Sequence, residues 1–296
     1  MKHKILVPID FGSQSLVALD YARFYASRID AEIILLNVLE ESGIFQKILT
    51  PDLEEKMANQ AEMALKQLAA ERLQGINHKI CIRVGKPYEM IEAVADEHKP
   101  LMIVMGKTEE LTLKKKFLGS NTMHVIQETV YPVVSVIGQN PVDDLTDTVF
   151  VPMDLSKPVK EQISTAIEFA KIFNARIYAF SVDVSDDIAY ETKLLTGMHQ
   201  VKKAVEKAGI ECETEIIEGK KSQVVDLIND RSEKLKPIFT VIMVRDETRV
   251  NDFLIGSIAK DILQTVKYPV LTEKPWDEKM ETHPLVKVLF DPLNIL

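Results

Sequence analysis

An internal repeat constrains the fold of this chain more than any other feature of its sequence. Three short motifs of the first half return in the second half in the same order, at offsets of 137 to 144 residues. They are Val7-Pro8-Ile9-Asp10 with Val151-Pro152-Met153-Asp154, Gly119-Ser120 with Gly256-Ser257, and Tyr131-Pro132-Val133 with Tyr268-Pro269-Val270. Self-similarity of this kind indicates repeated structural units, and a length of 296 residues suits two domains. We predict domains at residues 1–142 and 143–275, followed by a C-terminal tail at 276–296.

Within each half, short apolar runs alternate with segments of helical periodicity. The expected strands are Lys4–Ile9, Ala31–Val38, Lys79–Val84, Leu101–Met105 and Val133–Ile137, and then Thr148–Met153, Ala175–Val182, Glu213–Ile217, Phe239–Val244 and Val270–Thr272. Nearly continuous apolar strands separated by helices are typical of a parallel sheet that is covered on both faces. Each half is therefore predicted to be an α/β domain with five parallel strands.

Composition excludes several classes of partner. A net charge of −9 and a pI near 5.3 argue against general binding to nucleic acid or to an anionic membrane, because both need a basic surface. No apolar run is long enough to span a bilayer. The first residues pass directly into a strand pattern, which leaves no room for a signal peptide and favours a cytoplasmic location. Cys81 and Cys212 have no metal or disulfide spacing and are expected to be buried thiols.

The residues around the fourth expected strand suggest a phosphate site. Gly106 ends a buried apolar run, and a glycine there lets a backbone or a ligand approach closely. Gly119 and Ser120 open the next helix, where free N–H groups and a hydroxyl suit an anion. No catalytic constellation accompanies this site: the six histidines are scattered without metal-ligand spacing, and no nucleophile motif is present.

Each half resembles a domain of the universal stress protein family, and the whole chain resembles a tandem two-domain member. The resemblance covers about residues 1–138 and 146–273. It rests on Val7-Pro8-Ile9-Asp10, Val84-Gly85-Lys86-Pro87, Leu101–Gly106, Gly119–Thr122 and Tyr131–Val136. It implies a Rossmann-like domain (adenine nucleotide alpha hydrolase-like) with a parallel sheet of order 3-2-1-4-5. The ligand then belongs outside the carboxyl ends of strands 1 and 4, at the topological switch point.

The family's nucleotide motif, G-x2-G-x9-G-[ST], maps onto Gly106, Glu109, Gly119 and Ser120, so a glutamate replaces the middle glycine. The resemblance also implies that Asp10 and Val38 contact the adenine and ribose. Thr122 offers the phosphates a further hydroxyl, and Lys107 offsets the charge of Glu109 together with the lysines at 114–116.

Each of these residues also has a structural interpretation. Asp10 suits a turn or helix cap, Val38 suits the core, Ser120 suits an N-cap, and a run of lysines suits a solvated loop.

The second half keeps fewer of these features. Asp154, Gly219, Gly256 and Ser257 remain, but Met243 and Asp246 stand where the motif has its first two glycines. Ala259 replaces the hydroxyl of Thr122. We expect little or no nucleotide there and predict that this half is the structural partner of the first.

These observations and the resemblance favour a regulatory module of the stress response that binds an adenine nucleotide, ATP with Mg²⁺, through the first domain. The two halves would form an internal pseudo-dimer, and two chains could pair again. One alternative is a protein–protein scaffold of the same fold that has lost nucleotide binding. The other is a slow ATPase, for which Glu109 is the notable candidate base.

Overall fold

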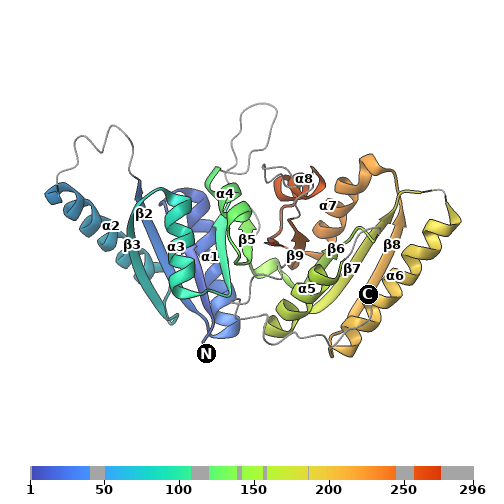
Figure 1. Ribbon diagram of the computed structural model, residues 1–296. Helices are drawn as coiled ribbons and strands as arrows, with labels where there is room; N and C mark the ends of the chain where they lie inside the picture. The colour runs from blue at the N-terminus through green and yellow to red at the C-terminus, as the bar shows by residue number, and fades with distance from the viewer. Residues whose placement is uncertain are drawn as a thin grey trace. The chain divides into compact units, whose positions relative to one another are not determined.

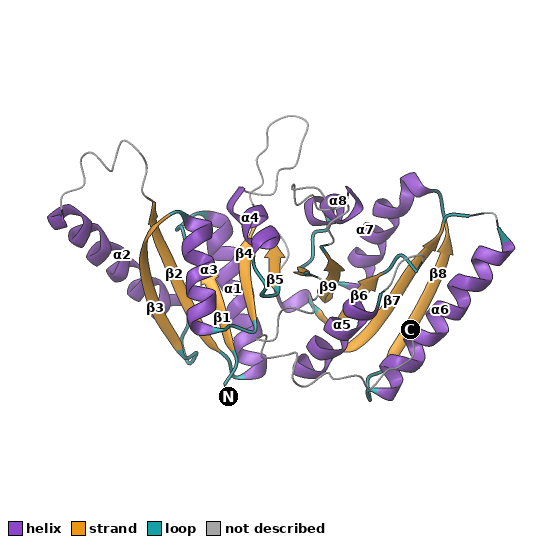
Figure 2. Ribbon diagram, viewed as in Figure 1, coloured by secondary structure: helices purple, strands orange, loops and turns teal. Residues whose placement is uncertain are grey.

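A computed structural model of the chain contains two compact units, Met1–Asp144 and Leu145–Leu296 (Figure 1). The structure describes residues 2–40, 51–107, 120–138, 142–155, 159–185, 187–244 and 257–274. Each unit is an α/β domain in which helices alternate with strands along the chain (Figure 2).

The first unit has five parallel strands in the order β3-β2-β1-β4-β5. Its elements are β1 (Lys4–Pro8), α1 (Ser13–Ile29), β2 (Glu32–Glu40), α2 (Pro51–Arg72), β3 (His78–Gly85), α3 (Pro87–His98), β4 (Met102–Gly106), α4 (Ser120–Glu128) and β5 (Val133–Val136), with the 3-10 turn η2 (Val142–Asp144) at its end. Right-handed crossovers place α1 and α2 on one face of the sheet and α3 and α4 on the other, as Figure 1 shows.

The second unit repeats this arrangement, with parallel strands in the order β8-β7-β6-β9-β10. Its elements are β6 (Thr146–Pro152), α5 (Lys160–Phe173), β7 (Arg176–Asp183), α6 (Ile188–Lys207), β8 (Cys212–Glu218), η3 (Lys221–Gln223), α7 (Val224–Leu235), β9 (Pro237–Met243), α8 (Ser257–Thr265) and β10 (Val270–Glu273). The predicted fold class is therefore confirmed, and the strand order 3-2-1-4-5 occurs in both units.

The helix ends repeat as well. Asp30 after α1 and Asn174 after α5 both adopt the left-handed conformation, and so do Lys99 after α3 and Lys236 after α7. A left-handed residue ends a helix by turning its N–H back to a carbonyl of the last turn. Equivalent helices in the two units thus end with the same left-handed C-terminal cap. This supports the internal repeat independently of the sequence motifs.

The core consists of the apolar strands and the helix faces that cover them. Ile5, Leu6 and Val7 of β1 are fully buried, because this strand lies between two neighbours and beneath helices on both faces. Cys81 and Cys212 are buried free thiols, as expected. Within the described residues, no helix is long and apolar enough to cross a membrane.

Several strand ends differ from the prediction by one or two residues, and the end of β2 matters for the candidate site. β2 continues to Glu40 instead of ending at Val38, because Leu39 and Glu40 extend the ladder with Val84 and Gly85 of β3. Val38 is therefore an interior residue of the strand, paired with Arg83 and partly exposed.

Candidate functional site

The candidate site lies at the carboxyl ends of β1 and β4, which are adjacent in the first sheet. The chain enters this edge at Asp10, whose carboxylate Oδ1 accepts a hydrogen bond of 2.8 Å from the N–H of Gly12. Asp10 thus forms the turn that leads into α1, as its structural interpretation predicted, and its side chain remains exposed. The neighbouring Phe11 is also exposed and has a positive φ of 62°, a strained conformation that is typical of functional loops.

Gly106, the last residue of β4, is required by packing. A Cβ at this position would lie 2.3 Å from the carbonyl oxygen of Gln14 and 2.8 Å from its Cβ. The close approach that the sequence predicted is therefore the approach of the first turn of α1 to the end of β4.

On the other face of the sheet, the first turn of α4 is tied to the same strand end. The hydroxyl of Thr122 donates a hydrogen bond of 3.1 Å to the carbonyl oxygen of Gly106, and Thr122 is buried. Its hydroxyl proton is thus used within the fold and is not available to a phosphate. Ser120 is the first residue of α4 and is exposed, so it lies inside the helix and not at the capping position before it.

Lys107 follows Gly106 and is buried, with an exposed fraction of only 2%. The interpretation of Lys107 as part of a solvated lysine loop was therefore wrong. Its Nζ has no hydrogen-bond partner within the part of the chain that the structure describes. Burial lowers the pKa of this amine from its usual 10.5 to about 7, because a charged ammonium is poorly solvated inside a protein.

Two further polar groups at this edge were missed by the sequence analysis. The Nδ2 of Asn37 on β2 donates a hydrogen bond of 2.7 Å to the carbonyl oxygen of Ile9, while its Oδ1 is buried without a partner among the described residues. The Oε1 of Gln14 on α1 is also buried and has no hydrogen-bond partner among the described residues. For Asn37, the available signal was a polar residue inside the apolar run of Ile33–Leu39.

Several predicted site residues lie outside the described part of the chain. They are Glu109, Gly119, Asp246 and Gly256. Their proposed contacts with a ligand therefore remain predictions from the sequence.

At two described positions of the corresponding edge, the second unit has no unpartnered side-chain atom. Ser181 occupies the place of Asn37, and its hydroxyl donates a hydrogen bond of 3.0 Å to the carbonyl oxygen of Met153. Val244 stands in the place of Lys107: the backbone N–H of Lys107 donates to Val136, and that of Val244 donates to Glu273. At these two positions the second unit thus keeps the backbone arrangement without an unpartnered polar atom.

The remaining predicted residues of the second unit have structural roles or are solvated. A Cβ on Gly219 would lie 2.8 Å from Cδ1 of Leu227, so this glycine permits the packing of α7. Asp154 and Ser257 are exposed. The carboxylates of Asp154 and Asp183 help to raise the pKa of Tyr190, after the larger effect of burial.

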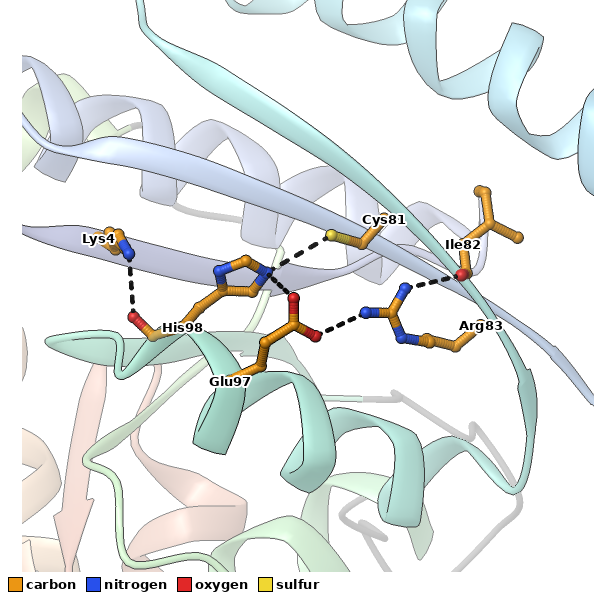
Figure 3. Close-up of polar contacts among 6 residues, drawn as sticks. All are labelled: Lys4, Cys81, Ile82, Arg83, Glu97 and His98. Carbon is orange, nitrogen blue, oxygen red and sulfur yellow. Dashed lines mark hydrogen bonds and ion pairs between the residues drawn. The ribbon is translucent and has the colours of Figure 1, made fainter.

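A second polar cluster of the first unit joins β3 to the end of α3 (Figure 3). Cys81 Sγ lies 3.8 Å from Nε2 of His98, which is 3.4 Å from Glu97, and Glu97 pairs with Arg83 at 2.7 Å. Burial raises the pKa of Cys81 and lowers the pKa of His98, so both groups are held neutral. A nucleophilic pair needs a thiolate and an imidazolium, so this cluster is structural. No metal-binding group of histidine, cysteine and carboxylate side chains occurs in the described ranges.

Comparison with known proteins identifies the class of protein to which this fold and site belong. The sequence profile of the universal stress protein family matches residues 1–136 and again residues 146–273. The chain is therefore a tandem two-domain member of the universal stress protein family, as the sequence resemblance predicted.

Individual relatives agree with this assignment. Universal stress protein MJ0577 of Methanocaldococcus jannaschii is 29% identical over 159 residues, which are 47% of this chain and 98% of that protein. A universal stress protein from Archaeoglobus fulgidus has a similar structure, with a TM-score of 0.72, 21% identity, and coverage of 92% of this chain and 98% of its own. The protein PA1789 from Pseudomonas aeruginosa, whose function is unknown, has a TM-score of 0.67 at 21% identity, with 93% of each chain covered. Both structures support the two-unit fold.

Proposed function

We propose that the first unit binds an adenine nucleotide, as ATP with Mg²⁺, and that the chain acts as a nucleotide-dependent regulatory module. The second unit contributes the fold and binds little or no nucleotide. The nature of the ligand is inferred from membership of the family, and the choice of unit comes from the geometry of this chain.

One observation carries the proposal. The three buried polar side-chain atoms that lack partners in the described part of the first unit belong to Gln14, Asn37 and Lys107. All three residues lie at the carboxyl edge of the sheet, on the first turn of α1, near the end of β2 and just after β4. Buried polar groups are nearly always hydrogen-bonded in native proteins. Two acceptors and one donor at the edge where such sheets bind ligands support a polar ligand there.

The second unit supplies the matched comparison. In the described part of the second unit, the buried side-chain atoms that lack a hydrogen-bond partner are the hydroxyl oxygens of Ser232 on α7 and Thr240 on β9. Thr240 lies in the interior of its strand, and Ser232 lies in the last turn of its helix, so neither belongs to the carboxyl edge of the sheet.

No described residue favours the ATPase alternative. A carboxyl whose pKa is raised to about 7 does occur at Glu168, but this residue lies on α5 in the second unit. The candidate base Glu109 rests on the sequence alone.

Isothermal titration of the full chain with MgATP tests the proposal. We expect one site per chain, and we expect Asn37→Ser combined with Lys107→Val to abolish binding. These changes install the residues that the second unit carries at the same positions, so the variant should fold. The reciprocal positions in the second unit, Ser181 and Val244, offer the matched control, because Ser181→Ala should leave binding unchanged.

The outcomes separate the alternatives. Absence of heat above dilution would favour the scaffold, and a stoichiometry of two would show that the second unit also binds. Release of phosphate during the titration would favour the slow ATPase over a binding module.

A further inference from the structure

Lys107 is the most unusual polar residue of the first unit. It is 98% buried, and its Nζ meets no acceptor among the described residues. Its backbone N–H still pairs with Val136, so the residue continues the ladder of β4. Since side chains alternate along a strand and a Cβ on Gly106 would point at Gln14 of α1, the side chain of Lys107 points to the opposite face, where α3 and α4 lie.

The start of α4 lies against this strand end. Thr122, in the first turn of α4, donates its hydroxyl to the carbonyl oxygen of Gly106, and the first turn carries no acidic residue. The N-terminus of a helix bears a partial positive charge that favours anions. A protonated amine beneath it would be repelled, and an anion between the two would be attracted by both.

The charges on the surrounding elements do not change this preference for an anion between Lys107 and the start of α4. The described titratable residues of the elements packed around β4 are Lys4 of β1 and Asp10 after it, then Asp20, Tyr21, Arg23, Tyr25 and Arg28 of α1, Tyr88, Glu89, Glu92, Asp96, Glu97 and His98 of α3, and His124 and Glu128 of α4. β4 and β5 carry none. Burial is the cause that lowers the pKa of Lys107, and no charge on these elements contributes to the shift.

The second unit shows that the fold itself does not require this lysine. Val244 occupies the same place, is 7% exposed, and makes the same type of backbone hydrogen bond, at 3.0 Å. Among the described residues, a buried amine therefore occurs only in the unit that also keeps the other unpartnered polar groups.

We propose that Lys107 couples ligand binding to the uptake of up to one proton: at pH 8 the amine is mostly neutral in the free protein and becomes an ammonium ion when a phosphate group enters the site beside α4. The proton comes from the solvent, and no covalent bond to the ligand forms. This inference rests on the proposed nucleotide-binding function and adds a dependence on pH to it. Nucleotide affinity then falls as the pH rises above neutrality. The fraction of the protein that is bound to nucleotide therefore depends on pH as well as on nucleotide concentration.

The test is titration with MgATP at pH 8.0 in two buffers of different ionisation enthalpy, such as HEPES and Tris. The difference in observed heat gives the number of protons taken up. From a free pKa of about 7, we expect about 0.9 proton per site at pH 8.0, and an affinity that falls about eightfold between pH 7.5 and pH 8.5. Lys107→Met should bind about tenfold more weakly at pH 7.5, because a charge-assisted contact is lost, and should take up no proton.

The controls separate this inference from the function on which it rests. Lys203→Met removes an exposed lysine of α6 and should retain both the affinity and the proton uptake of the unchanged protein. Binding by the unchanged protein without proton uptake, or equal pH dependence in Lys107→Met, would overturn the coupling and leave the nucleotide site standing. Absence of binding by the unchanged protein would overturn the proposed function, and this inference with it.

Discussion

Replacing Lys107 by methionine should stabilise the protein when no ligand is present. In the free protein the amine has to be either charged without a partner or neutral at a pH where an exposed lysine is charged. Both states are unfavourable for folding. Methionine has a similar length and volume without the amine, and an apolar residue already occupies the equivalent position as Val244.

The size of the effect follows from proton linkage. The pKa of Lys107 falls from 10.5 in the unfolded chain to about 7 in the folded one, and each pKa unit corresponds to about 1.4 kcal/mol. Because the folded pKa is lowered, the cost is absent above pH 10.5, grows as the pH falls, and is complete below pH 7. The upper bound is about 5 kcal/mol at pH 6, about 4 kcal/mol at pH 7 and about 2 kcal/mol at pH 9.

Urea denaturation followed by far-ultraviolet circular dichroism at these three pH values measures the effect. Lys107→Met should raise the free energy of unfolding most at pH 6 and 7. At pH 9 the gain should be smaller by up to about 2 kcal/mol than at pH 7 and by up to about 3 kcal/mol than at pH 6. Lys203→Met, an exposed replacement in α6, should change little at any pH. A variant that is no more stable than the original chain, or a gain that does not depend on pH, would refute the account of Lys107 as a buried, unpaired amine.

Three further predictions concern other parts of the chain. Burial and the neighbouring Glu273 raise the pKa of Glu168 to about 7, so the folded protein loses stability as the pH rises from about 4.5 to 7. In urea denaturation, Glu168→Gln should raise the free energy of unfolding by up to about 3 kcal/mol at pH 8 and leave it unchanged at pH 4. Burial raises the thiol pKa of both Cys81 and Cys212, so neither should react readily with a disulfide reagent at pH 8 until the chain is unfolded, and rapid modification of the native protein would contradict this. From the sequence alone, Glu109→Gly should tighten MgATP binding by removing a negative charge from the phosphate loop, and an unchanged dissociation constant in the titration would show that this side chain is not the obstacle.

The fold could be predicted because its determinants are local and repeated. The apolar runs of β1, β4, β6 and β9 are visible in the sequence because these strands are buried on both faces, and the recurring motifs fix the correspondence between the units. The end of β2 could not be predicted in the same way. Its last residue is set by the hydrogen-bonded ladder with β3, which involves residues more than forty positions away in the sequence.

The positions of some candidate site residues were predictable, but their chemical states were not. Asp10 and Gly106 were correctly expected at the carboxyl ends of adjacent strands, because the strand order determines which ends meet. The state of Lys107 depends instead on the direction of a single side chain just past a strand, so a solvated and a buried lysine look alike in the sequence. The same holds for Thr122, whose hydroxyl binds a carbonyl oxygen of the fold instead of facing outward.

The contrast between the two units gives the strongest reason to assign a ligand to the first. A buried polar group without a partner costs about 1–3 kcal/mol of folding free energy. The free energy of unfolding of a folded protein is usually only about 5–15 kcal/mol, so the unpartnered groups of Gln14, Asn37 and Lys107 together offset a large part of it. The second unit shows that this cost is avoidable, since Ser181 and Val244 keep the same backbone arrangement with their polar groups satisfied or absent. A ligand that donates to the two oxygens and accepts from the amine would remove the cost in the bound state. The free energy recovered in this way would appear as binding affinity. The proposed ligand would thus explain why, among the described residues, the less stable arrangement occurs in the first unit only.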